Sequence, residues 1–160
     1  MAFIANGTTL GDGLSHADQY RVSADFTGDQ APITQWELTD TDGFGGIGTA
    51  MGVSSGVFSF AVTGIWLISM YAQVKVPTGT GTAGFVIQTT TDNGTYDTAA
   101  RSQVTGGDNS NEYLSFMFDV TNVSTHKVKF SCEFDNQASG LGGHSTESKT
   151  GCTFLRLGAT

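Results

Sequence analysis

Hydrophobic and polar residues alternate with a period of two along most of the chain after residue 30. This pattern predicts β-strands that bury one face. It is clearest over residues 65–76, where Trp66, Ile68 and Met70 lead an unbroken apolar row. Turn residues separate the segments, and the expected strands cover 33–38, 47–51, 57–62, 65–76, 85–90, 96–104, 113–120, 128–134 and 152–157. Because no helical pattern lies between them, we expect an all-β, antiparallel jelly-roll β-sandwich.

The first 30 residues do not show this alternation. Asn6-Gly7 and Gly11-Asp12-Gly13 are turn signals, and apolar residues such as Phe3 and Tyr20 are widely spaced. A segment of this kind is typical of an extended terminal arm. The sequence therefore predicts an arm over 1–30 and one jelly-roll domain over 31–160.

Composition narrows the possible partners. The 160 residues hold 22 Gly, 11 Phe and only 14% charged residues, with a formal net charge of −8. Nucleic-acid binding needs a basic surface, so we expect no nucleic-acid partner. The chain shows no apolar run of membrane-spanning length and no signal-peptide pattern at its start, so we expect synthesis in the cytoplasm and no membrane partner.

Three expected strands are apolar on both faces. A sandwich buries only one face of each sheet, so a second apolar row would expose a hydrophobic patch on a monomer. We interpret the second rows as a self-association surface rather than as scattered exposed residues. The candidate interface residues are Leu67, Tyr71, Tyr113, Met117, Leu155 and Leu157.

Residues that commonly carry chemistry do not form a recognisable site. His16, His126 and His144 lie far apart without metal-ligand spacing, and no nucleophile or phosphate-loop motif is present. We expect no enzymatic activity, no cofactor and no metal. Aspartates at 40, 42, 92 and 97 resemble incomplete calcium loops, but turn formation explains them more simply. Cys132 and Cys152 are expected as free thiols, with one disulfide left open.

Two segments resemble a known family. Gly56 to Ile68 (GVFSFAVTGIWLI) and Gly151 to Gly158 (GCTFLRLG) are similar to the central and final strands of the jelly rolls of tumour necrosis factor and of the globular heads of complement component one, subunit q. Residues 18–22, 39–44, 55–58 and 153–160 resemble small virion proteins of marine tailed bacteriophages. The resemblance to the tumour necrosis factor and complement jelly rolls covers roughly 33–160. The resemblance to the phage proteins implies a trimeric structural protein displayed on a virus particle.

The resemblance leads to a functional expectation. We expect a homotrimeric capsid decoration (cement) protein on the exterior of a bacteriophage virion. Its partners are sister copies and the major capsid protein, which the arm reaches through Phe3, Ile4, Leu10 and Tyr20.

Two alternatives remain open at this point. A receptor-binding tip of a tail or head fibre would act through the loops 77–84, 106–111 and 139–150. A secreted calcium-dependent, lectin-like binding domain would instead use the aspartate-rich turns.

Overall fold

The computed structural model describes residues 3–5, 8–10, 14–77 and 79–160, with side chains described from residue 14 onward. Within these residues every regular element is a strand. The strands are β1 (Phe3–Ala5), β2 (Thr8–Leu10), β3 (Ala17–Val22), β4 (Phe26–Thr27), β5 (Trp36–Leu38), β6 (Gly52–Ser54), β7 (Val57–Ser59), β8 (Gly64–Lys75), β9 (Gly81–Thr90), β10 (Asp97–Gly106), β11 (Asn111–Val120), β12 (Lys127–Phe134), β13 (Gly140–Leu141) and β14 (Gly151–Gly158).

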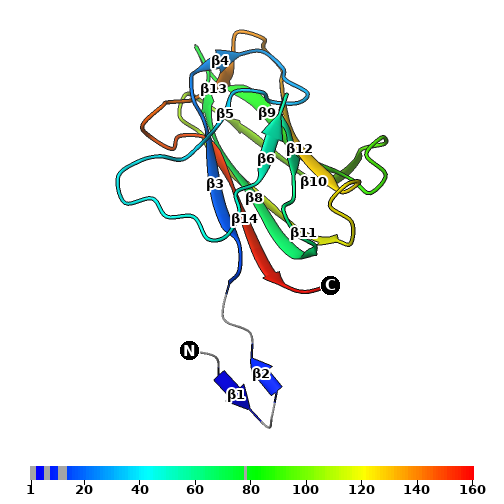
Figure 1. The fold of residues 1–160 in the computed structure, drawn as a ribbon. Helices are drawn as coiled ribbons and strands as arrows, with labels where there is room; N and C mark the ends of the chain where they lie inside the picture. Colours follow the sequence, from blue (N-terminus) through cyan, green and yellow to red (C-terminus); the bar gives the residue numbers. More distant parts are fainter. Residues whose placement is uncertain (1–2, 6–7, 11–13, 78) are drawn as a thin grey trace.

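Two antiparallel sheets pack face to face (Figure 1). The five-stranded sheet has the order β10-β9-β12-β7-β6. The seven-stranded sheet has β11, β8, β14, β3 and β5 side by side, and β13 and β4 continue it beside the last residues of β8. The two long strands that pair with β8 are β11 and β14, and both are distant from β8 in sequence. Such crossing connections are typical of a jelly roll and not of a meander. The fold class predicted from the alternating pattern is confirmed.

The core lies between the sheets and is dominated by aromatic rings. Phe58 on β7 is completely buried, and its ring centroid lies 5.1 Å from Tyr20, 5.7 Å from Trp36, 5.6 Å from Phe130 and 5.0 Å from Phe154. Such edge-to-face and tilted pairs add to the free energy of burial. The cluster therefore joins strands of both sheets through one side chain.

The central prediction for residues 65–76 is confirmed. Strand β8 spans Gly64–Lys75, and its Trp66, Ile68 and Met70 side chains are buried in the core. Successive side chains of a strand point to opposite faces. The other row, which begins with Ile65 and Leu67, therefore faces away from the core.

The predicted boundary of the arm at residue 30 is wrong. Residues Ala17–Val22 form β3, which lies inside the seven-stranded sheet between β14 and β5. Tyr20 is buried there, and its hydroxyl donates to the carbonyl oxygen of Met51. Tyr20 is thus a core residue and not part of an arm. Before residue 14, the structure describes only the short β1–β2 hairpin.

The two cysteines lie in different sheets. Cys132 on β12 and Cys152 on β14 are both buried and free. Burial raises the pKa of the Cys132 thiol to about 12 and raises the pKa of Cys152 well above its usual value. The structure thus contains the free thiols that the sequence favoured, and not the disulfide it left open.

This burial predicts low thiol reactivity in the folded protein. Only the thiolate attacks disulfide reagents, so an aromatic disulfide reagent at about pH 8 should modify neither cysteine in the native protein. In denaturant both should react within minutes. A native thiol that titrates at the unfolded rate, or a mass that rises by two protons on reduction, would contradict the buried free-thiol assignment.

No helix among the described residues has the length and apolar character needed to cross a bilayer.

Candidate assembly face

An apolar row crosses the outer face of the seven-stranded sheet from edge to edge. Met117 on β11 is paired with Leu67 on β8, Leu67 with Leu155 on β14, and Leu155 with Ala17 on β3. A further bridge joins Ala17 to Ile47 in the loop that follows β5. Directly paired side chains on one face lie about 5 Å apart. These five residues therefore form one continuous stripe, termed the apolar row.

The apolar row is open to solvent at its two ends. Met117 is 63% exposed and Ile47 is 43% exposed, whereas Leu67 and Leu155 are half-buried between their neighbours. The next row along the same face is polar, with Ser115, Ser69, Thr153 and Gln19 in register. The exposed apolar surface is therefore bordered on this side by hydroxyl and amide groups, as an interface core is bordered by a polar rim.

A third row on this face is partly covered by loops. Arg21 on β3 has no exposed side-chain surface, although it lies on the outer side of the sheet. Its Nε donates to Glu37 at 2.7 Å and its Nη1 to Thr41 at 2.9 Å, while Nη2 reaches Asp40 and the Ser145 carbonyl oxygen. These bonds tie the loops after β5 and after β13 over the sheet. They leave the band around the apolar row as the open part of the face.

A notch lies at one end of the apolar row. The notch has a volume of about 190 Å3. It is lined by Ala17, Gln19, Thr153 and Leu155 of the sheet and by Phe44 from the loop after β5. Met117 stands at the opposite edge of the face, on β11. The face thus has a protruding methionine at one edge and a hollow at the other.

The structure brings together most of the predicted interface residues. Leu67, Met117 and Leu155 lie in the apolar row, and Tyr113 and Tyr71 form a register pair on the same face. Tyr113 is 59% exposed, whereas Tyr71 is half-buried and lies against Gly151. Leu157 lies beyond the row at a register shift between β14 and β8, and it is 49% exposed.

Sequence reasoning missed two members of this face, Ile47 and Phe44. The strand expected over 47–51 is wrong, because Ile47 forms only an isolated bridge in a loop and the next strand, β6, begins at Gly52. Phe44 lies in the same loop, where the period-two pattern assigns no face. A weak signal existed. Gly45, Gly46 and Gly48 lie beside Phe44 and Ile47, and such closely spaced glycines indicate a loop rather than a strand.

The structure does not describe the side chains of the other three residues predicted to contact the capsid. Phe3, Ile4 and Leu10 belong to β1 and β2 in their backbone, but their side chains lie outside the described residues. Nothing in the described part of the chain tests their role.

The histidines are separated in space as they are in sequence. His126 is buried in the loop before β12, where its ring stacks on Phe118 at 5.5 Å and contacts the hydroxyls of Thr121 and Thr125. His16 lies beside Trp66, and His144 bonds to Thr146 in a surface loop. Over residues 14–77 and 79–160, no three His, Cys, Asp or Glu side chains are grouped to hold a metal ion.

The aspartate-rich turns use their carboxylates internally. Asp92 accepts hydrogen bonds from the backbone N–H groups of Gly94 at 2.8 Å and Thr95 at 2.9 Å, and its pKa is lowered by a bond from Thr90 together with these two. Asp40 is paired with Arg21. These contacts support the turn interpretation of both segments over the calcium-loop interpretation.

Comparison with known proteins identifies the fold but no sequence family. No family model matches the chain, and no curated protein matches it. Solved structures of murine APRIL match with TM-scores of 0.64 and 0.66 at 13% identity, covering 89% of this chain and 98% of the other. Eiger TNF from S. frugiperda matches with a TM-score of 0.60 at 10% identity, covering 90% of this chain and 93% of the other. The chain therefore has the tumour-necrosis-factor-like jelly-roll fold.

Proposed function

We propose that the chain is a non-enzymatic virion structural protein, a homotrimeric decoration protein on the exterior of a bacteriophage head. The observation that carries the assembly part is the apolar row, which ends in the 63% exposed Met117. A band of this kind is costly to leave in water on a protein that is otherwise acidic and polar. Sister copies that cover it remove that cost.

The asymmetry of the face favours a ring. Met117 protrudes on β11 at one edge, and the notch beside Leu155 and Phe44 lies toward the other. A knob and a hollow on different parts of one surface join head to tail, and head-to-tail contacts that close produce rings. Three is the smallest number of copies in such a ring. The trimer that the family resemblance implies thus agrees with the shape of the face.

The virion part of the proposal rests on the resemblance of residues 18–22, 39–44, 55–58 and 153–160 to small phage virion proteins. A trimer has the valency of the three-fold and quasi-three-fold positions of a capsid lattice. Three arms on one trimer raise the effective concentration of each weak contact with the major capsid protein. The β1–β2 hairpin lies at the end of the sandwich where the chain enters and leaves (Figure 1).

Deleting residues 1–13 tests this role. The deletion leaves β3 intact, so the protein should remain folded and assemble with the same number of copies as the full-length protein, because the apolar row is untouched. It should lose at least about tenfold in affinity for purified heads stripped of this protein, since three arm contacts are removed together. Co-sedimentation with the heads measures the loss. Unchanged occupancy of the heads would contradict the decoration role.

Copy number separates decoration from the alternative of a fibre tip. A decoration protein occupies lattice sites in hundreds of copies, whereas a tip is present in about a dozen. Quantitative gel densitometry of purified virions against the major capsid protein should give a ratio of the order of one to one. A ratio below about one in twenty would favour the receptor-binding tip.

A further inference from the structure

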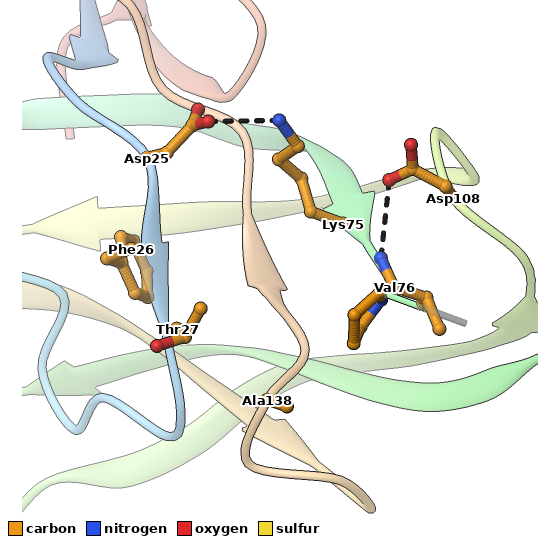
Figure 2. A pocket seen from close by; sticks show the side chains of 8 residues that line it. Asp25, Phe26, Thr27, Lys75, Val76, Asp108 and Ala138 are labelled. Atoms are coloured by element: carbon orange, nitrogen blue, oxygen red, sulfur yellow. Dashed lines mark hydrogen bonds and ion pairs between the residues drawn. The ribbon is translucent and has the colours of Figure 1, made fainter.

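A pocket of about 460 Å3 is lined in part by β4, which Figure 1 shows at the end of the sandwich opposite to the C-terminus and the β1–β2 hairpin. Four segments line it: strand β4 with the residue before it, the end of β8, the loop after β10 and the loop before β13. Figure 2 shows Asp25 and Lys75 at one margin, Asp108 at another, and Thr27 and Ala138 across the opening. Two of the three loops that the sequence suggested for recognition contribute Pro77 and Asp108.

A glycine next to this pocket lets β4 lie close against β13. Gly140 on β13 is paired with Thr27 on β4 and with Lys75 on β8, so the three residues form one cross-strand row. Gly140 adds no side chain between the other two. A Cβ atom at this position would lie 1.8 Å from the Phe26 carbonyl oxygen, which excludes any larger residue without movement of β4. Gly140 therefore fixes the position of β4, which contributes Phe26 and Thr27 to the lining of the pocket.

The polar groups of the pocket are held in place. Lys75 Nζ lies 2.9 Å from one Asp25 carboxylate oxygen, and the other oxygen accepts the backbone N–H of Gly143 at 2.9 Å. Asp108 accepts the backbone N–H of Val76 at 3.3 Å. The bond to Lys75 lowers the pKa of Asp25, and the same bond raises the pKa of Lys75, so both groups stay charged at neutral pH.

The balance of groups defines the ligand class. Two carboxylates disfavour an anion, and Lys75 competes with any cation for Asp25. Phe26, Pro77 and Ala138 add apolar surface to the same lining. A ligand that satisfies all of them is neutral, offers adjacent donors and acceptors, and has an apolar face. We propose that this pocket binds a neutral saccharide of one or two rings, a size that suits its volume.

The position of the pocket makes it independent of the assembly face. Lys75 is eight residues beyond Leu67 on the same strand, a separation of about 26 Å at 3.3 Å per residue. A trimer that attaches to a particle through its arms would present three such pockets away from the shell. Three linked sites convert weak saccharide binding into strong binding to a glycan-covered surface.

The proposal can be tested by nuclear magnetic resonance. Neutral saccharides are titrated into the isotope-labelled protein, and the amide signals are followed. The probes are methyl glucoside, methyl galactoside, methyl N-acetylglucosaminide and lactose, each to about 50 mM, because single-site affinity is expected on the order of 1 mM. At least one probe should shift the amide signals of Val76, Asp108 and Gly143. The shifts should be the same in low and moderate salt, since a neutral ligand releases no screened charge.

Three variants locate the site. Lys75→Met removes the donor while keeping the stem, and should weaken binding at least about tenfold. Ala138→Phe fills the opening from an exposed position, and should abolish binding. Lys129→Met, a lysine on β12 that lies over the Tyr96 ring and does not line the pocket, is the matched control and should bind normally.

The proposal fails if none of the four saccharides shifts these amides, or if the shifts survive both Lys75→Met and Ala138→Phe. It also fails if citrate or lysine amide shifts them and the saccharides do not. Because the pocket is complete within one chain, a monomeric Met117→Lys protein should bind the same saccharide. If the protein proves not to form a trimer, this test of saccharide binding therefore still applies.

Discussion

Replacing Met117 with lysine should convert the assembled protein into monomers that remain folded. Met117 is 63% exposed in the single chain, so the change costs the monomer little. In the assembly, the lysine would place a charge without a partner in the apolar contact, at a cost of about 2–4 kcal/mol for each of three contacts. The dissociation constant should rise more than about 100-fold, as measured by sedimentation velocity over a range of concentrations.

Two controls accompany this variant. Val53→Lys places the same charge on β6, an edge strand of the five-stranded sheet, at a residue that is 38% exposed. It should leave the assembly intact. Met117→Leu keeps an apolar side chain of similar volume and should also assemble. If the lysine variant assembles as well as these controls, the apolar row is not the contact between copies.

Replacing Phe58 with alanine should destabilise the folded chain strongly. The side chain is completely buried and contacts aromatic rings from both sheets. Removing a buried phenylalanine costs about 3–5 kcal/mol, because the cavity adds to the lost burial. Urea unfolding in the Met117→Lys background measures this loss without the linkage between assembly and stability.

Val53→Ala in the same background is the control for Phe58→Ala. It removes methyl groups from an exposed strand and should change the free energy of unfolding by less than about 0.5 kcal/mol. A Phe58→Ala loss below about 1 kcal/mol would contradict the central role of the aromatic cluster.

The alternating rows predicted the architecture because burial on one face is a local property of each strand. Residues 65–76, 113–120 and 128–134 each carry an apolar row that faces the core, and each forms a long strand. Strand β3 was missed for a physical reason. Its inward row is Asp18, Tyr20 and Val22, and the carboxylate of Asp18 breaks the apolar pattern.

Asp18 is stable in its buried position because of a contact that sequence periodicity does not reveal. Its carboxylate accepts the backbone N–H of Met51 at 2.7 Å, from a segment 33 residues away. Burial raises its pKa in spite of this bond. Arg21 poses the same difficulty, since its partners come from two distant loops. Because the partners of these buried polar residues are distant in sequence, β3 does not show the alternating pattern of a strand, and its residues were assigned to the arm.

The assembly face and the pocket differ in how far sequence could predict them. Leu67, Met117 and Leu155 were predicted together, because both rows of their strands are apolar. The pocket depends on β13 pairing with both β4 and β8, which brings Thr27 and Lys75 to the same end of the sheet. Two-residue strands such as β4 and β13 are too short to produce a periodic pattern, so this meeting appears only in the folded chain.

Sedimentation equilibrium of the unmodified protein at micromolar concentration tests the proposed assembly most directly. We expect a single species with three times the 16.7 kDa mass of the chain. A species with the mass of one chain, stable over the whole concentration range, would mean that the apolar row stays in water, and it would contradict the assembly through this face.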